Sequence, residues 1–473
     1  MDFATQLQVI RPEVWMACLA LLVLTAELVF KEKEVLAVLT VASVAIVAVF
    51  TLINPPGVAF SDMFISDNFS RFFKVIFYIN AILVTFISVR YLKVEDIHYG
   101  EYYSLILFST LGMMIMASSG DLILLYLGLE LMALSTYVLA GFKRTDPKSN
   151  EAALKYFMLG AFSSAILLYG ISMVYLSTGT TVIQEIALKV TNPDLQHTQV
   201  MIGVLFLMVA FAFKIAAVPF HMWAPDVYEG APTPITAFMS VGPKAAGFSV
   251  LARVFLVGFE PLSADWKLYL SILAVLTMAV GNILALTQTN IKRMLAYSSI
   301  AHAGYILLGI IAGTADGLSS MMNYLFIYAF MNIGAFAMII LLNTETGKGD
   351  EIADYEGLSK THPIAAAIML IFMFSLTGIP PTAGFVGKFY LFVGVIEAGY
   401  TWLAVVAVIF SAVSAYFYLR VVMFMYMKEP VKRLAIVPSA TESLAVFCTT
   451  LAVLAIGVFP TYFVDFARST IQF

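Results

Sequence analysis

The chain has 473 residues, of which 61% are hydrophobic and only 12% are Asp, Glu, Lys or Arg. Soluble proteins carry about 25% charged residues, so this composition indicates an integral membrane protein with little folded mass outside the bilayer. The formal net charge is −4 and no basic tail occurs, which argues against a nucleic-acid-binding function.

The two cysteines, Cys18 and Cys448, lie in apolar runs. Iron–sulfur and structural zinc centres usually need about four ligands, mostly Cys, so we expect no metal centre and no cofactor site in this chain.

The first apolar run follows MDFATQLQVIRPEVW, which has no positively charged n-region, and no A-x-A-like cleavage site comes after it. These features predict a retained transmembrane helix rather than a signal peptide. A helix needs about 20 apolar residues to cross a bilayer. We therefore predict an all-α polytopic membrane protein with about fourteen transmembrane helices. The candidate spans are 13–30, 35–53, 72–92, 102–118, 121–142, 151–178, 199–226, 232–257, 266–289, 291–312, 318–343, 364–398, 402–427 and 442–464.

The seventh and twelfth spans are too long for a simple helix and are interrupted by proline. Breaks are expected at VPF, 218–220, and at GIPP, 378–381, because proline removes a backbone donor. In a membrane such breaks persist only inside protein or beside a water-filled cavity, and matched breaks mark transporter sites. The two breaks lie five helices apart, and repeats of an odd number of helices have opposite topology. We therefore predict two inverted five-helix repeats, formed by spans 4–8 and 9–13.

This pattern divides a single membrane domain, 1–473, into four parts. They are an N-terminal three-helix segment at 1–100, a first repeat at 101–258, a second repeat at 259–428 and a C-terminal helix at 429–473.

The orientation follows from the excess of Lys and Arg in cytoplasmic loops. The odd-numbered loops hold fourteen basic residues, and the even-numbered loops with the two ends hold six. The fourteen are Lys31, Lys33, Arg90, Lys93, Lys143, Arg144, Lys148, Lys292, Arg293, Lys348, Lys360, Lys428, Lys432 and Arg433; the six are Arg11, Arg71, Lys74, Lys189, Lys267 and Arg468. We therefore expect both termini to face the periplasm.

Four ionisable residues lie deep within the apolar spans: Glu130, Lys214, Lys244 and Lys388. A charge at the centre of a bilayer costs about 3 kcal/mol on insertion scales, so such residues are functional by default. The alternative is a buried ion pair that only fixes helix packing.

Three other cations lie nearer the ends of their spans. Arg253 and Arg420 are close enough to the interface for snorkelling. Lys155, one turn from the cytoplasmic end of its span, is either functional or part of the surface.

Apolar surroundings disfavour the charged form of a lysine, and a neighbouring carboxylate restores it. Moving that carboxylate switches the lysine between holding and releasing a proton. We predict that Glu130 is the partner of Lys214, that Lys244 receives the proton next and that Lys388 passes it outward. His302, about eleven residues into its span, is either a neutral relay or a hydrogen-bonded buried histidine.

Two other patterns give weaker indications of a site. His221, Asp226 and Glu229 have metal-ligand side chains, but their spacing fits no standard site and favours helix-end packing. The run GFVGK lacks the first glycine and the final Ser or Thr of a phosphate-binding loop. We expect no nucleotide site.

Several of these residues lie in motifs that resemble a known family. The stretch FKIAAVPFHMWAPDVYEGAPTPITAFMSVGPKAAGF, 213–248, resembles the antiporter-like, proton-translocating membrane subunits of respiratory complex I (NADH-quinone oxidoreductase), in particular those of the subunit N type. The runs IKRMLAYSSIAHAGYILLG, 291–309, and TGIPPTAGFVGKFYLF, 377–392, resemble the same family. The similarity covers roughly residues 100–427.

The resemblance implies a fourteen-helix subunit with inverted repeats and one proton channel, coupled to quinone reduction in other subunits. Carried over by motif, Glu130 and Lys214 are the pair of helices 5 and 7, Lys244 is the central lysine and Lys388 is the terminal residue of broken helix 12. Lys155 and His302 fall on the polar axis. The resemblance further implies neighbouring complex I membrane subunits and the lipid bilayer as partners, with NADH, FMN, iron–sulfur clusters and quinone bound elsewhere. It also implies the bacterial inner membrane.

One alternative is a subunit of a multisubunit cation/proton antiporter, which shares this ancestry; FHMWAPDVYEGAPTP, 220–234, is the feature that argues against it. A related complex that uses ferredoxin as the electron donor is another alternative. A purely structural anchor is disfavoured because an anchor has no reason to carry buried charges.

Overall fold

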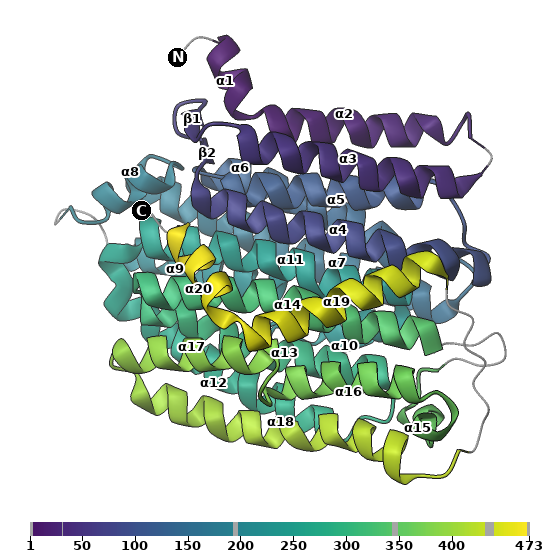
Figure 1. The fold of residues 1–473 in the computed structure, drawn as a ribbon. Coiled ribbons are helices and arrows are strands. Elements are labelled where there is room, and N and C mark those ends of the chain that lie inside the picture. The colour runs from purple at the N-terminus through teal and green to yellow at the C-terminus, as the bar shows by residue number, and fades with distance from the viewer. Residues whose placement is uncertain (1–2, 31, 193–196, 343–348, 431–438, 471–473) are drawn as a thin grey trace.

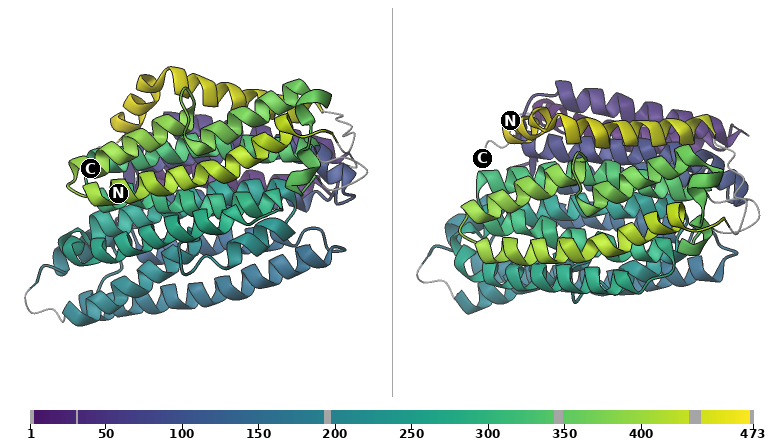
Figure 2. Two further views of the ribbon diagram at one scale, coloured as in Figure 1. Left: turned by 90° about the horizontal axis from the view of Figure 1, so that it is seen from below. Right: turned by 60° about the horizontal axis from the view of Figure 1, so that its bottom comes forward.

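The structure is a computed structural model that describes residues 3–30, 32–192, 197–342, 349–430 and 439–470. It is a bundle of helices that run roughly alongside one another (Figures 1 and 2). A short hairpin of β1 (Gly57–Ala59) and β2 (Phe64–Ser66) pairs antiparallel at one end, with Val58 opposite Ile65.

The N-terminal part contains α1 (Phe3–Val9), α2 (Arg11–Ala26), α3 (Lys33–Ile53) and α4 (Asn68–Val94). The next part contains α5 (Glu101–Ser118), α6 (Leu122–Ala140), α7 (Pro147–Thr178), α8 (Ile183–Lys189), α9 (His197–Lys214), α10 (Trp223–Gly230) and α11 (Thr233–Arg253). A π-helical turn, Val254–Gly258, and a 3₁₀ turn, Glu260–Leu262, continue α11 toward the second half.

The second half contains α12 (Ser263–Leu286), α13 (Ile291–Ala312), α14 (Ala315–Leu342), a 3₁₀ turn (Ile352–Tyr355), α15 (Leu358–Thr361), α16 (Pro363–Thr377), α17 (Ala383–Glu397) and α18 (Thr401–Met427). The chain then forms α19 (Ala440–Val458) and α20 (Pro460–Ser469), which cross the bundle diagonally (Figure 1). Helices α11, α13 and α14 are the most enclosed: every residue of α11 is buried, and so is every residue of α13 except Arg293.

Each of the fourteen predicted spans corresponds to helix. Within the described residues, eleven helices are long and apolar enough to cross a membrane, and a twelfth span results if the bent pair α1 and α2 is counted as one. The helical, polytopic character is therefore confirmed, whereas the number fourteen stays a prediction. The lower number arises partly because some helices are short: α2 has 16 residues, and the broken twelfth span is split into α16 and α17 with 15 residues each.

Both predicted helix breaks occur. The first separates α9, which ends at Lys214, from α10, which begins at Trp223, and the second separates α16 from α17 at 378–382. Each contains a proline, which can neither donate a backbone hydrogen bond nor continue the preceding helix. The breaks leave Lys214 just before the first gap and Lys388 in the second turn after the second gap.

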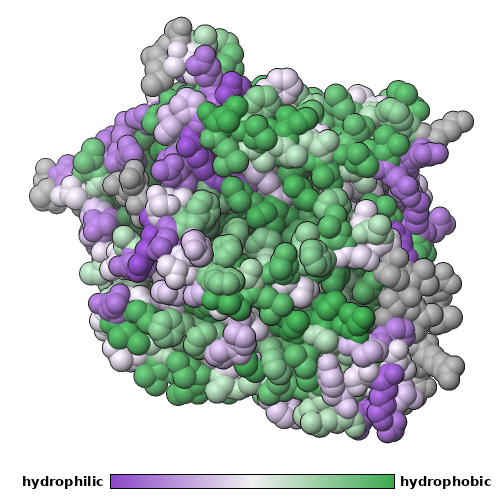
Figure 3. All heavy atoms as spheres, in the orientation of Figure 1, coloured by the Kyte–Doolittle hydropathy of each residue, from purple (hydrophilic) through white to green (hydrophobic). Residues whose placement is uncertain are grey.

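On the face that Figure 3 shows, the side chains divide into a central apolar zone and two polar ends. Figure 3 shows hydrophobic residues across the middle of this face and hydrophilic residues gathered toward its two ends. The two ends of the chain lie at the same end of the bundle, near the hairpin (Figure 1). Lys31, Lys348, Lys432 and Arg433, which entered the orientation argument, lie outside the described residues.

One prediction for the loops is wrong. Lys74, counted among the loop residues, lies inside α4 with 1% exposure, and its ammonium is 2.6 Å from a carboxylate oxygen of Glu13 on α2. The error arises because Lys74 lies only two residues inside the predicted span 72–92 and was counted with the loop before it, whereas α4 begins at Asn68 and buries this side chain.

A second prediction, that Arg253 snorkels, is also wrong. Its guanidinium is 5% exposed and lies 2.9 Å from the carboxylate of Asp67, which caps α4. It also contacts the ring of Phe69, with 4.9 Å between the guanidinium carbon and the ring centroid. Because the Asp67 carboxylate at the start of α4 neutralises the guanidinium inside the protein, the Arg253 side chain does not have to extend to water. Arg420 binds the carbonyls of Leu286 and Gln288 at the end of α12.

The Glu13–Lys74 pair generates a stability prediction. Replacing Lys74 by Met leaves an uncompensated buried carboxylate, which costs about 3–5 kcal/mol, whereas the double variant Glu13→Gln/Lys74→Met recovers most of that loss. The thermal stability of the detergent-purified assembly measures both effects. Lys93→Met is the control, because its pair with Glu34 is about half exposed. Equal losses in Lys74→Met and Lys93→Met would contradict the prediction.

Candidate functional site

Lys214 is the last residue of α9 and is 5% exposed. Its ammonium lies 3.5 Å from the hydroxyl of Tyr137 on α6 and over that ring. Glu130, also on α6, forms no direct ion pair with Lys214. Instead, Ser164 on α7 donates a hydrogen bond to the Glu130 carboxylate. The structure therefore brings the expected pair into one region, with Tyr137 between the two helices.

Lys244 lies in the middle of α11 and is 2% exposed. Its ammonium donates to Ser299 on α13, at 2.8 Å to the carbonyl oxygen and 2.6 Å to the hydroxyl. The ring of Tyr228 on α10 lies 5.9 Å away. This contact joins the first half of the chain to the second.

His302 is also buried, one turn further along α13 than Ser299. Its Nδ1 is 2.7 Å from the hydroxyl of Tyr324 on α14, and its Nε2 is 3.1 Å from the hydroxyl of Tyr418 on α18. The Tyr418 hydroxyl also bonds Ser298. A histidine between two hydroxyls can donate through one nitrogen and accept through the other, so the geometry fits both a relay and a satisfied core histidine.

Lys388 is held by the helix that precedes its own. Its ammonium donates to the carbonyls of Leu376 and Thr377 at the end of α16, at 3.2 and 2.8 Å, and to the hydroxyl of Ser411 at 2.9 Å. Tyr305 of α13 presents its ring 5.1 Å from the same ammonium. Carbonyls at a helix C-terminus carry partial negative charge, so the break creates a binding site for the cation.

Helix α13 connects these groups. It contributes Ser299 to Lys244, His302 to the two tyrosines, and Tyr305 to Lys388. These three residues lie at intervals of three along the helix, which places them on neighbouring positions of one helical face. A buried polar line therefore runs from Lys244 to Lys388 across the second half.

The tyrosines that contact Lys214 and His302 were not predicted from the sequence. Tyr137, Tyr324 and Tyr418 lie in apolar helices among 23 tyrosines, and no spacing rule distinguishes them from core aromatics. Only the packing of α6, α14 and α18 reveals their partners.

Lys155 lies apart from this line, with 41% of its side chain exposed. Its ammonium is 2.7 Å from the carboxylates of Glu151 and Asp226. Arg293 on α13 bridges Asp226 at 2.7 Å and Glu229 at 3.1 Å, and Glu229 also pairs with Lys148 at 3.0 Å. These ion pairs join α7, α10 and α13 at the surface.

The cluster settles what two of the candidate metal ligands contact. Asp226 and Glu229 pair with cations, as expected for helix-end packing, and the structure groups no three His, Cys, Asp or Glu side chains at metal-binding geometry among the described residues. Burial alone would raise the pKa of Glu229, but hydrogen bonds from Lys148 and Arg293 hold it below its ordinary value. This carboxylate therefore stays ionised near neutral pH.

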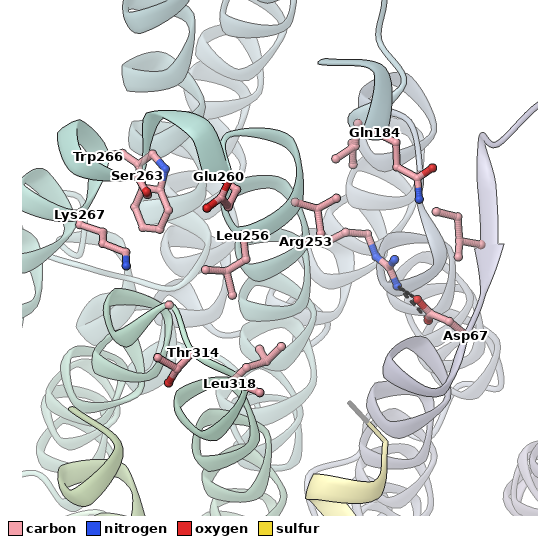
Figure 4. Close-up of a pocket in the computed structure, with 16 residues that line it drawn as sticks. Asp67, Gln184, Arg253, Leu256, Glu260, Ser263, Trp266, Lys267, Thr314 and Leu318 are labelled. Atoms are coloured by element: carbon pink, nitrogen blue, oxygen red, sulfur yellow. Dashed lines mark hydrogen bonds and ion pairs between the residues drawn. The ribbon is translucent and has the colours of Figure 1, made fainter. Parts of the chain in front are cut away.

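A cavity of about 620 Å³ lies at the end of the bundle that carries α8 and β2. The Asp67–Arg253 pair forms one side, and Lys267, Trp266 and Thr314 line the other, as Figure 4 shows. None of the predicted site residues lines it. The buried lysines are therefore separate from this cavity.

Comparison with solved structures identifies the class of protein. The fold resembles a chain of respiratory complex I from Thermus thermophilus with a TM-score of 0.82 and 31% identity, over 97% of this chain and 99% of that one. A chain of the Mrp complex from Dietzia sp. has a TM-score of 0.85 at 20% identity, which shows a shared fold. Residues 119–414 match the family described as NADH:quinone oxidoreductase/Mrp antiporter, TM. Fold and buried lysines thus define an antiporter-like membrane subunit.

Relatives among characterised proteins narrow the assignment. NADH-quinone oxidoreductase subunit N of Trichlorobacter lovleyi is 49% identical over 98% of this chain and 97% of its own length. Subunit N 2 of Rhizobium meliloti is 50% identical over 96% of this chain and 95% of its own length. The chain belongs to the NADH-quinone oxidoreductase subunit N family.

The surface cluster generates a pH-dependent prediction. Glu229→Gln should lower stability by about 1 kcal/mol or less at pH 7, because the pairs are partly exposed and screened. A carboxylate whose pKa is lowered in the folded state stabilises it above the ordinary value of 4.5, and this contribution disappears as the pH falls through the lower folded value. The melting temperatures of the wild type and of Glu229→Gln should therefore differ at pH 7 and approach each other as the pH falls below 4.5. Glu397→Gln, at an exposed position, is the control; a loss that grows in acid would contradict the prediction.

Proposed function

We propose that this chain is a proton-translocating membrane subunit of NADH-quinone oxidoreductase that moves protons through buried Lys and Glu side chains. The observation that carries the proposal is the line from Lys244 through Ser299 and His302 to Lys388, buried along its length. The chain itself is a non-redox translocase, and quinone reduction takes place in other subunits.

The residues have separate roles in this proposal. Glu130 sets the charge of Lys214 through space, and Tyr137 lies where a proton can leave the Lys214 ammonium. Lys244 receives the proton and passes it to the hydroxyl of Ser299. His302 relays it between Tyr418 and Tyr324, and Lys388 is the terminal carrier. Lys155 acts in the surface cluster with Glu151 and Asp226, and not as a buried proton carrier.

The arrangement of helices supports a further proposal about architecture. The chain forms fourteen spans with two inverted repeats, one made of α5, α6, α7, α9 with α10, and α11, the other of α12, α13, α14, α16 with α17, and α18. Residues 1–100 precede them, 101–258 and 259–428 contain the repeats, and 429–473 contain the C-terminal helices. The breaks occupy corresponding positions, the fourth span of each repeat.

We further propose that both termini face the periplasm of the bacterial inner membrane. The chain is a subunit of a multisubunit membrane complex, and its partners are neighbouring antiporter-like and small membrane subunits together with lipid. NADH, FMN, iron–sulfur clusters and quinone are bound by the partner subunits and not by this chain.

The cation/proton antiporter and the ferredoxin-linked complex are not favoured. Relatives that match nearly the whole chain at 49–50% identity are named subunit N of NADH-quinone oxidoreductase, whereas the Mrp chain shares 20% identity.

The lysines are tested by substitution in the complete complex. Lys214→Ala or Lys388→Ala should lower the number of protons pumped per electron by about two-fold or more while the complex stays assembled, because each removes a positioned proton carrier. Proton uptake into vesicles, measured with NADH oxidation, gives the ratio. Lys360→Ala is the control, since its pair with Glu429 is exposed. A normal ratio in both variants would rule out the proposed route.

The assignment to NADH-quinone oxidoreductase is tested by purification through a tag on this chain in mild detergent. Co-purification of NADH:quinone reductase activity that rotenone- or piericidin-type inhibitors block is the expected result. An intact assembly without that activity would favour a different electron donor or the cation/proton antiporter.

A further inference from the structure

Two parts of the chain contact the second helix break, 378–382: the Lys388 side chain of α17 and the backbone of α19. On one side, the Lys388 side chain lies over Gly378, where an added Cβ would be 2.9 Å from the Lys388 Cδ. On the other side, Gly457 in the last turn of α19 touches the break. A Cβ at Gly457 would lie 2.7 Å from the carbonyl carbon of Pro381 and 2.8 Å from that of Thr382. The backbone of α19 therefore rests directly on the Pro381–Thr382 peptide.

Helix α19 is anchored at its start. Glu442 in its first turn is 1% exposed, closes a capping box with Ser439, and lies 3.3 Å from Arg90 on α4. Removing one partner of a buried ion pair is costly, so this contact holds the start of the helix against α4.

The segment after Gly457 is anchored as well. The chain bends at Pro460 into α20, whose Phe463 and Phe466 rings lie 6.3 Å from Phe326 and 5.7 Å from Phe72. Arg468 pairs with Asp316 at 3.0 Å. Figure 1 shows α19 and α20 passing over α14 in front of the bundle. The contact with the break thus lies between two fixed points.

We propose that α19 acts as a strut that fixes the second break, and that Gly457 is a positioning residue for proton transfer at Lys388. The carbonyls of Leu376 and Thr377 that hold the ammonium lie at the start of this break, and the Pro381–Thr382 peptide lies at its end. Displacing that peptide moves α17, which carries Lys388, relative to α16, which carries the carbonyls. This inference rests on the proposed role of Lys388.

The substitutions Gly457→Ala and Gly457→Val enlarge the contact by one and by three carbons. In the assembled complex we expect the protons pumped per electron to fall by about two-fold in Gly457→Val and by less in Gly457→Ala, because a misplacement of about 1 Å at a reacting group slows transfer strongly. The rate of NADH oxidation by an artificial acceptor reports assembly. Leu451→Phe, at a position of α19 that is 54% exposed, is the matched control and should pump normally.

Two further measurements separate positioning from general damage. The solvent deuterium isotope effect on coupled turnover should rise in Gly457→Ala, because proton transfer becomes more rate-limiting. Adding Gly457→Ala to Lys388→Ala should cause no further loss of turnover. If Gly457→Val does not assemble, Gly457→Ala with these two readouts decides the matter.

The outcomes distinguish this inference from the function on which it rests. A wild-type pumping ratio in both Gly457 variants, or losses that multiply with Lys388→Ala, would overturn the strut while leaving Lys388 as a carrier. Unimpaired pumping in Lys388→Ala would overturn the role of Lys388 as a proton carrier, on which the inference rests.

Discussion

The structure depends on how a positive charge is accommodated inside an apolar bundle. Lys388 shows the solution: the ammonium is bound by two carbonyls at the end of α16 and by the Ser411 hydroxyl. Those carbonyls are free because the chain breaks at Gly378 and cannot continue the helical ladder. The break and the lysine therefore need each other, since either alone would leave unsatisfied polar groups in a medium that offers no water.

The first half solves the same problem differently. Lys214 ends α9 beside a break, but its ammonium has one hydrogen-bond partner, the Tyr137 hydroxyl at 3.5 Å. The two halves thus combine a weakly bound ammonium at Lys214 with one at Lys388 that donates three hydrogen bonds, and α13 contributes contacts to both Lys244 and Lys388.

Charges at the periphery serve a structural purpose. The Arg293 pairs with Asp226 and Glu229 hold α10 and α13 together where they reach the surface, and the Arg90–Glu442 pair holds α19. Removing one partner of such a pair costs little when the pair is exposed and much more when it is buried. These pairs fix the positions of α10 and α19. Helix α10 places Tyr228 near the Lys244 ammonium, and α19 places Gly457 against the second break.

The sequence by itself determined that the chain is a helical membrane protein, where its helices break, and which lysines lie deep in the bundle. Hydrophobic spans, prolines and buried lysines are local features whose cost in a bilayer is fixed by residue type. The sequence placed Lys74 in a loop and predicted that Arg253 reaches the membrane interface. It did not show which residues surround Lys155. Those questions turn on a partner from a distant part of the chain: Glu13, Asp67 and Asp226, respectively. Only the tertiary structure decided them, because whether a charge is solvated or paired depends on which helices pack together.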